Sequence, residues 1–448
     1  MRPKTSQRSA SSVAPRDASS SDVVLRTRLA NGLTVILCPR AHLSQTYTSL
    51  FFGVGSRHET PRTNGISHML EHMLFRGTAS YADATALNAA AEGFGGFLEG
   101  ATYRDHMIFA TVSHPSSVGD SVRILGELAQ TPRYRATEVE RGILREEILE
   151  TLDADGRVVD LDNISHAAVF GKHGLSLPIE GTLANLERFG RRDLELHRSR
   201  HLVGRNAVVA VAGPFNVDAV QREVERSFGG MPPGDATNDD APPVVDAPEP
   251  ALRYVRDTAS QVDIRLSFRA PPVQDPEYPA LIMLARVLAD GLASRMHAEL
   301  VDRKGLAYVL HAGLTTYTDC GLFEFDVAVA PDRAAETVST ILKFTESAGR
   351  LRYRPEELDR ARRRYRYGME FMRDSAVELA SWHGRAALFG IEDAMQRLGG
   401  QIEAVNDDQI RAAARRIFQR PGMVLTAVGE LARGEWARVK DAVDRFRR

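Results

Sequence analysis

The chain has 448 residues, of which 43% are hydrophobic and 26% are charged, a composition typical of ordinary globular proteins. Its length predicts two domains of roughly 200 residues each, because a single hydrophobic core seldom grows larger. The 57 basic residues nearly balance the 59 acidic ones and no long apolar run occurs, so we expect no nucleic-acid partner and no membrane span.

Residues 1–22 are rich in Ser, Ala and Arg and contain no apolar core, which excludes an ordinary secretory signal. We expect a disordered tail here, although an organellar transit peptide has a similar composition. The two cysteines, Cys38 and Cys320, form no disulfide framework. They favour a reducing compartment, and we therefore expect a cytoplasmic location.

The first half, residues 23–228, alternates strand-like and helix-like patterns. The segment GISHMLEHMLFRGT at 65–78 predicts a helix. A strand is expected at 106–113, just before Pro115, and helices are expected at 116–130 and 136–152.

A segment rich in Pro, Gly and Asp at 229–250 predicts a linker. The second half, residues 251–448, repeats the order of the first, with a strand at 322–330, a helix at 333–348 and another helix from Pro355. Aligning 137–148 with 356–367 places Glu140 opposite Asp359 and Glu147 opposite Arg366. We therefore predict an α+β fold of two homologous halves, each a sheet with helices packed against it.

His68, Glu71 and His72 form the pattern H-x-x-E-H on the helix predicted at 65–78. At about 100° per residue, His72 lies about 40° around the helix from His68, so both imidazoles can bind one ion. Glu71 lies about 60° to the other side, where it can reach a water on that ion. Two imidazoles and a carboxylate are ligands that zinc prefers, and this spacing occurs in metallopeptidases.

A third ligand is expected from the helix at 136–152, where Glu140 and Glu147 lie on one side because they are seven residues apart. Glu147 could bind the metal while Glu140 supports catalysis by orienting a ligand or the substrate. Glu146 and Glu150 fit a solvated acidic face instead.

These motifs resemble the pitrilysin/insulinase family of metallopeptidases, also called inverzincins. The resemblance rests on LANGLTVIL (29–37), GVGSRHE (53–59), HMLEHMLFRGT (68–78), ERGILREEI (140–148) and LASRMHAELVDRKGLAY (292–308). It implies Zn²⁺ held by His68, His72 and Glu147, and catalytic roles for Glu71 and Glu140. It also implies that the halves form half of a clamshell, in which peptides bind as an added strand inside a closed chamber.

Two positions depart from the family pattern. Glu99 and Gly100 stand where the family generally has Asn-Ala, in a strand that lines the substrate, so Glu99 predicts a preference for basic peptides. The resemblance implies that Tyr308 binds substrate together with an Arg seven residues earlier, but that position is Val301. Either Arg295 or Arg303 compensates, or a partner chain supplies the Arg/Tyr pair.

The sequence thus predicts a zinc-dependent endopeptidase that acts on peptides or unfolded segments, with a water activated by Glu71. A heterodimer with a sister chain bearing the Arg/Tyr pair is expected, with a homodimer as the alternative. Two other functions remain open: a non-catalytic structural subunit and a specialised leader-peptide maturase. The remaining histidines without ligand spacing are expected mostly on the surface or in loops (His106, His114, His166, His173, His197, His201), and Trp382 is expected in the core with Leu379 and Leu388.

Overall fold

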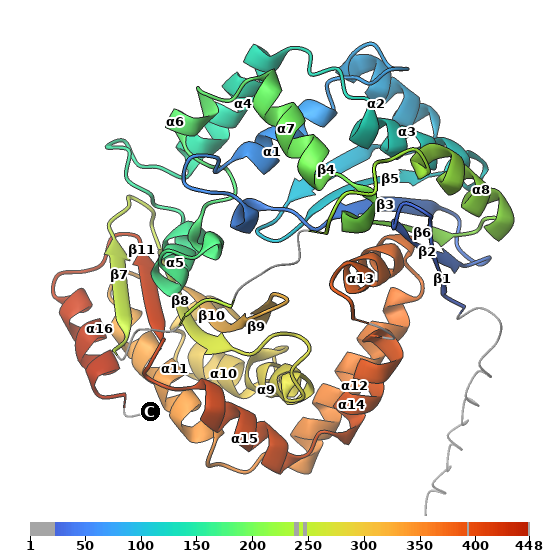
Figure 1. The fold of residues 1–448 in the computed structure, drawn as a ribbon. Helices are drawn as coiled ribbons and strands as arrows, with labels where there is room; N and C mark the ends of the chain where they lie inside the picture. The colour runs from blue at the N-terminus through green and yellow to red at the C-terminus, as the bar shows by residue number, and fades with distance from the viewer. Residues whose placement is uncertain (1–22, 237–241, 245–248, 392–393, 447–448) are drawn as a thin grey trace, which may run out of the picture.

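The computed structural model describes residues 23–236, 242–244, 249–391 and 394–446, which form two sheets with helices around them (Figure 1). The expected tail at 1–22 lies outside the described residues, as do parts of the expected linker at 229–250. The segment from 25 to 213 supplies one sheet and the segment from 251 to 428 supplies the other.

The first sheet has six strands in the order β1-β2-β6-β3-β5-β4. Strands β2 and β6 are parallel, and every other neighbouring pair is antiparallel. Strand β4 lies at one edge, where it pairs with β5 alone. The strands are β1 (Leu25–Arg28), β2 (Thr34–Pro39), β3 (Thr46–Phe52), β4 (Leu98–Thr102), β5 (Met107–Ser113) and β6 (Ala207–Gly213).

The second sheet has five strands in the order β7-β11-β8-β10-β9. Its pairings have the same directions as β2-β6-β3-β5-β4 in the first sheet, with β7 and β11 parallel and the others antiparallel. This shared topology confirms the predicted fold class of two homologous sheet-plus-helix halves. The strands are β7 (Ala251–Val255), β8 (Val262–Ala270), β9 (Ala307–Thr316), β10 (Gly321–Val329) and β11 (Val424–Val428).

Helices follow the strands in the same order in both halves. The first half contains α1 (Ile66–Leu74), α2 (Ala84–Gly93), α3 (Val118–Gln130), α4 (Thr137–Glu150), α5 (Leu161–Phe170), α6 (Leu183–Leu186), α7 (Arg191–His201) and α8 (Val217–Phe228). The second contains α9 (Tyr278–Ala289), α10 (Arg295–His297), the π-helical turn η6 (Ala298–Arg303), α11 (Ala334–Ala348), α12 (Pro355–Met372), α13 (Ala376–Leu388), α14 (Ala394–Ala404), α15 (Asp407–Ile417) and α16 (Glu435–Asp444). Short 3-10 turns lie at Ser56–His58, Pro115–Ser117, Gly174–Ser176 and Gly204–Asn206.

The central strands β2, β3 and β6 of the first sheet are buried on both faces. In β2, Val35 and Leu37 join a core with α1, α3 and α8, whereas Ile36 and Cys38 face the opposite side. Side chains alternate along a strand, so a continuous apolar run of this kind predicts that both faces are covered.

Each half of the chain contributes one helix that packs on the sheet of the other half. Helix α13 of the second half packs on the first sheet through Ala376, Leu379 and Ala380. Helix α5 of the first half packs on the second sheet, where Val169 and Phe170 contact the cluster around Leu322. Because α5 follows α4 as α13 follows α12, the exchange matches the pseudo-symmetry of the two halves.

The predicted ends of β5, α3, α4, β10, α11 and α12 agree with the structure within two residues, whereas α1 ends at Leu74, four residues before the end of the segment expected to be helical. Among the described residues, none of the helices combines the length and the apolar character needed to cross a membrane.

Candidate metal centre

Helix α1 presents His68, Glu71 and His72 from the face opposite its core contacts. Met69, Leu70, Met73 and Leu74 are buried against the first sheet. This fixes the rotation of the helix, so the two imidazoles point towards α4.

The start of α1 is fixed by Glu59, which is buried. Its carboxylate accepts hydrogen bonds from the backbone N–H of Gly65 at 2.7 Å and of Ser67 at 2.8 Å. It also accepts one from the Asn64 side chain at 3.0 Å. A negative charge at a helix N-terminus satisfies free N–H groups and interacts favourably with the helix dipole. The sequence reasoning missed this role of Glu59, because Glu59 lies six residues before the N-cap Gly65, outside the positions where a capping residue is recognised.

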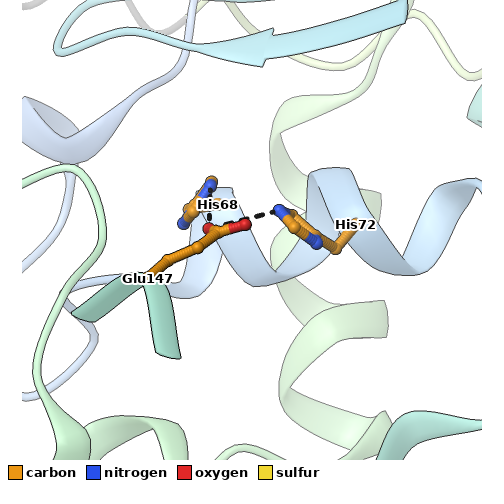
Figure 2. Close-up of side chains that lie close together, drawn as sticks. All are labelled: His68, His72 and Glu147. Atoms are coloured by element: carbon orange, nitrogen blue, oxygen red, sulfur yellow. Dashed lines mark ion pairs between the residues drawn. The ribbon is translucent and has the colours of Figure 1, made fainter. Parts of the chain in front are cut away.

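Helix α4 supplies the third side chain. Leu144 and Ile148 anchor it in the same core as α1, which turns Glu140 and Glu147 towards the histidines. The carboxylate of Glu147 lies between the two rings (Figure 2).

The geometry of these three residues suits a tetrahedral ion. Glu147 Oε2 lies 3.5 Å from His68 Nε2 and 3.7 Å from His72 Nε2. Both separations are too long for a good hydrogen bond. Zinc bonds of 2.0–2.1 Å would place two tetrahedral ligand atoms roughly 3.3–3.4 Å apart, close to the spacing here. Among the described residues, this trio forms the one group of three or more His, Cys, Asp or Glu side chains close enough to hold a metal.

The two histidines have different surroundings. Burial, helped by the neighbouring His72, lowers the pKa of His68 to about 3, so its ring is neutral as a metal ligand must be. His72 Nδ1 lies 2.8 Å from Glu140 Oε2, and Glu140 also pairs with Arg76. A carboxylate on the far nitrogen fixes the tautomer of a ligand histidine and leaves Nε2 for the metal. Glu140 therefore contacts a ligand, in agreement with a supporting role.

Glu71 lies beside the trio and is held from the first sheet. Thr102, at the end of the edge strand β4, donates its hydroxyl to Glu71 Oε2 at 2.7 Å. Burial raises the pKa of Glu71, whereas the Thr102 hydrogen bond acts in the opposite direction. A carboxylate with a raised pKa is a better proton acceptor. Thr102 was not identified from the sequence, because its partner lies 31 residues away.

The expected substrate-binding residues lie on the edge strands. Glu99 is exposed on β4, where its carboxylate accepts a hydrogen bond from the Tyr47 hydroxyl at 2.6 Å. Gly100 follows it, and a Cβ atom there would meet Phe75 at 2.7 Å and Glu71 at 3.0 Å. The Ala usual in the family at that position would require Phe75 to shift. Tyr308 lies in β9, but its side chain is outside the described part of the structure.

The two arginines considered as substitutes near Val301 already have partners. Arg295 forms an ion pair with Glu357 at 2.6 Å and lies over the Tyr353 ring. Arg303 is exposed and pairs with Glu299. Neither is free to take the role of the missing arginine without giving up these contacts.

The expectation that most of the remaining histidines lie on the surface or in loops is wrong for His166 on α5 and for His201 on α7, whereas His106 lies in the turn between β4 and β5. His106, His166 and His201 are buried, and His106 and His166 bond to Asp105 and Tyr317. The partner of His166 lies 151 residues away, which a local pattern does not reveal, whereas the partner of His106 is its neighbour in the chain. The expectation for Trp382 also needs correction, because Leu379 is in the core but Trp382 lines a cavity.

The chain is similar in sequence and fold to several known proteins. A Mycobacterium bovis protein named an uncharacterized zinc protease is 28% identical over 91% of this chain and 93% of its own length. A protease structure from Helicobacter pylori has a TM-score of 0.83 at 18% identity and covers 91% of this chain and 99% of its own. A chain of Complex III2 from Candida albicans has a TM-score of 0.78 at 17% identity, covering 94% of this chain and 100% of its own. At these identities, the two structures establish the fold alone.

Family profiles match both halves. Residues 35–183 match the profile described as Insulinase (Peptidase family M16), and residues 188–365 match the one described as Peptidase M16 inactive domain. The half that carries His68, His72 and Glu147 is therefore the one that matches the peptidase profile, and the chain belongs to the insulinase family, peptidase family M16.

Proposed function

We propose that this chain is a zinc-dependent endopeptidase that hydrolyses peptides or unfolded segments. The observation that carries the proposal is the convergence of two imidazole nitrogens and the Glu147 carboxylate, with the Glu71 carboxylate beside them. The donor set of two nitrogens and one oxygen is that of a catalytic zinc site with an open position. The zinc proteases among its relatives support the same assignment.

His68, His72 and Glu147 would hold the ion, and Zn²⁺ would supply a Lewis acid that lowers the pKa of water and polarises a carbonyl. Glu71 accepts a proton from the attacking water and then passes it to the leaving amine. Thr102 keeps the Glu71 carboxylate oriented through this transfer, because its hydroxyl donates to one carboxylate oxygen. Glu140 holds His72 through the opposite nitrogen.

The edge strand β4 supports peptides as the substrate class. Its free edge can pair with an extended peptide, which adds a strand to the sheet. Because Thr102 and Gly100 on this strand lie against Glu71, a peptide on that edge would pass the proton acceptor. The exposed Glu99 on the same strand favours basic side chains in the peptide.

The test is cleavage of a quenched, unstructured peptide library by the purified, zinc-supplemented chain. Glu71→Gln and a chelator should each abolish cleavage, and Glu71→Gln should retain about one zinc per chain. Glu146→Gln is the matched control, because Glu146 lies on α4 next to Glu147 but is exposed. Cleavage that survives both treatments would refute the zinc mechanism.

A second candidate is a non-catalytic subunit of a larger complex, which the similarity to a Complex III2 chain favours. The presence of all three metal-facing residues with Glu71 favours the enzyme. Zinc binding without cleavage of any peptide, alone or with a partner, would favour the structural subunit. Cleavage of a single leader peptide would instead identify a specialised maturase.

We also propose a partner subunit, because Val301 replaces the arginine expected beside Tyr308. A sister chain that carries the Arg/Tyr pair would form a heterodimer, and a second copy of this chain would form a homodimer. Light scattering of the purified chain distinguishes the two. A dimer that cleaves peptides excludes the need for a sister chain, whereas an inactive monomer that gains activity with a sister chain supports the heterodimer.

A further inference from the structure

A cavity of about 700 Å³ lies between the two halves. Its lining includes the turn between β4 and β5, helix α5, one face of the second sheet, and helices α13 and α14. Tyr103, which follows Thr102 in the chain, belongs to the lining, whereas His68, His72 and Glu147 do not. A cavity of this size is typical of a ligand site, and its charged groups indicate which ligand it accepts.

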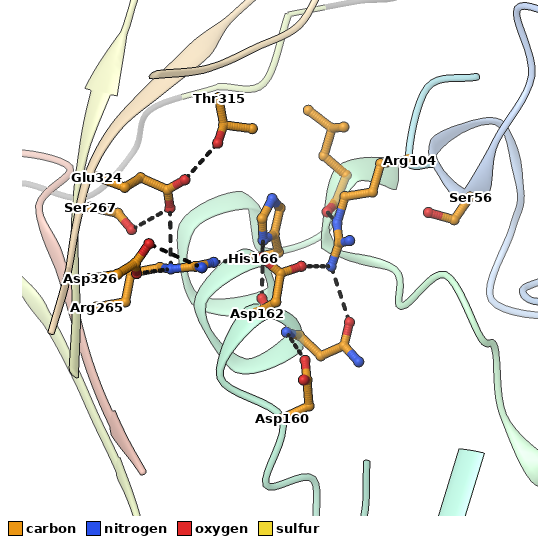
Figure 3. A network of polar contacts seen from close by, with 12 residues as sticks. Ser56, Arg104, Asp160, Asp162, His166, Arg265, Ser267, Thr315, Glu324 and Asp326 are labelled. Carbon is orange, nitrogen blue, oxygen red and sulfur yellow. Dashed lines mark hydrogen bonds and ion pairs between the residues drawn. The ribbon is translucent and has the colours of Figure 1, made fainter. Parts of the chain in front are cut away.

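The acidic groups that line the cavity already have partners within the chain. Arg265 bridges Asp162 and Asp326 across the two halves, and Asp162 also pairs with Arg104 at 3.0 Å (Figure 3). Five carboxylate residues line the cavity: Asp105, Asp162, Asp275, Glu324 and Asp326.

The other three are satisfied as well. Asp105 lies 2.7 Å from His106 Nδ1, and Asp275 forms an ion pair with Arg416 at 3.3 Å. Glu324 accepts hydrogen bonds from the hydroxyls of Ser267 at 2.9 Å and Thr315 at 2.8 Å. None of the five carboxylates is therefore available as a strong acceptor for a cationic ligand without breaking an internal contact.

The basic groups that line the cavity are not balanced in this way. Arg104 and Arg265 are paired, but Arg385 on α13 and Arg397 on α14 form no ion pair or side-chain hydrogen bond with any residue in the described part of the chain. Both guanidiniums are exposed. The two lining arginines that lack such a partner therefore lie on neighbouring helices, α13 and α14.

Trp382 places another donor on α13. Its indole Nε1 is buried and has no hydrogen-bond partner among the described residues. The indole nitrogen can only donate, so an acceptor from a ligand is the group that would satisfy it. Trp382, Arg385 and Phe389 are spaced three and four residues apart on α13 and therefore lie on one face of it.

We propose that the wall formed by Trp382, Arg385 and Arg397 binds a carboxylate of the peptide substrate. The inference rests on the proposed peptidase function and adds a substrate preference to it: a peptide with an acidic group within reach of α13. Guanidinium groups bind carboxylates through strong charge-assisted hydrogen bonds, and the indole N–H supplies a further donor. The carboxylate comes from an acidic side chain or from the C-terminus of the peptide.

The experiment measures binding by calorimetry to the zinc-supplemented full chain carrying Glu71→Gln, so that no turnover occurs. The probes are three short peptides of Gly, Ser and Ala. The first contains two neighbouring Glu and has an amidated C-terminus. The second has Gln in place of both Glu and keeps the amide, and the third is the Gln peptide with a free C-terminus. Tighter binding of the first peptide identifies a side-chain carboxylate, and tighter binding of the third identifies the C-terminus. Equal binding of all three would overturn the proposal.

Matched variants locate the site. Arg385→Gln combined with Arg397→Gln should weaken binding of the preferred acidic peptide by about tenfold or more and leave the amidated Gln peptide unchanged. Trp382→Phe should weaken it several-fold. The control, Arg192→Gln combined with Arg363→Gln, removes the same charge from exposed positions outside the cavity. An equal loss in this control would show that the effect is only long-range attraction and would refute the site.

The outcomes separate this inference from the proposed function. Peptide hydrolysis without any carboxylate dependence would leave the peptidase standing and reject the site on α13. Carboxylate-dependent binding without hydrolysis by the unmodified chain would support the site and reject the enzyme.

Discussion

At the candidate centre, the side chains that face the metal position are held by neighbours from other elements. His72 is held by Glu140 from α4, and Glu71 is held by Thr102 from β4. Glu71, His68 and His72 could be predicted from the sequence because their relation is set by local helix geometry. Thr102 and Glu59 could not, because their contacts depend on how separate segments pack.

Replacing Thr102 tests its role in positioning. Thr102→Val removes the hydroxyl that donates to Glu71 while keeping the shape, so we expect peptide cleavage to fall about tenfold, as for a lost hydrogen bond to a charged group. Zinc content should stay unchanged, because Thr102 does not contact the three ligands. Thr102→Ser, which keeps the hydroxyl, should restore most of the rate. An unchanged rate in Thr102→Val would reject the role.

Glu140 is expected to affect catalysis by strengthening the binding of zinc through His72. Glu140→Gln weakens the acceptor on His72 Nδ1 and the pair with Arg76, so zinc affinity should fall by about 10–100-fold. Competition with a chromogenic chelator measures this affinity. Glu146→Gln serves as the control on the same helix. If Glu140→Gln lowers cleavage but binds zinc as tightly as the unmodified chain, then Glu140 acts on the substrate instead.

Among the elements, helix α7 supports α1 from the side away from the sheet. His197 Nε2 on α7 lies 3.0 Å from the hydroxyl of Ser67, which precedes the candidate ligand His68 in the chain. His201, one turn later, packs next to His197 with ring centroids 4.7 Å apart. Burial, with His201 as the next cause, lowers the pKa of His197 to about 3, and burial lowers that of His201 to about 4.

These shifts predict a loss of stability in acid. Both histidines stay neutral in the folded chain, whereas the unfolded chain binds a proton on each below its ordinary pKa of about 6.5. The unfolded state therefore binds more protons, and the free energy of unfolding falls as the pH drops from about 6.5 towards about 4 and then 3. At pH 5, the contribution of His197 is on the order of 2 kcal/mol.

Urea denaturation at pH 7 and pH 5 measures this effect. His197→Asn should reduce the difference in unfolding free energy between the two pH values, because it removes one buried titrating group. His114→Asn, at an exposed histidine, should leave the difference unchanged. The same pH dependence in His197→Asn and the unmodified chain would show that other groups cause it.

For the molecule as a whole, the exchange of α5 and α13 joins the halves more closely than their sequence order suggests. The sequence predicted α4, α11 and α12 because each has a local amphipathic pattern. It could not predict that α13 packs on the first sheet, because Leu379 and Ala380 meet Phe51 and Ala210 across more than 150 residues of chain. A buried ion pair between Arg57 and Asp319 at 2.8 Å adds a further link between the halves.

The exchange predicts that both halves unfold in one transition. The two tryptophans report on different sheets, since Trp382 lies on α13 beside the first sheet and Trp436 packs against Tyr254 of the second. Trp436→Phe and Trp382→Phe therefore each leave one reporter, and their urea midpoints should coincide.

Leu379→Ala should shift both midpoints together, because it removes a buried side chain at the shared interface and costs about 2–5 kcal/mol. Leu87→Ala is a suitable comparison, since Leu87 is buried within the first half alone. Two separate transitions, or a Leu379→Ala effect confined to Trp382, would mean that the halves fold independently. The exchanged helix would then contribute little to holding the half with the candidate metal centre against the other half.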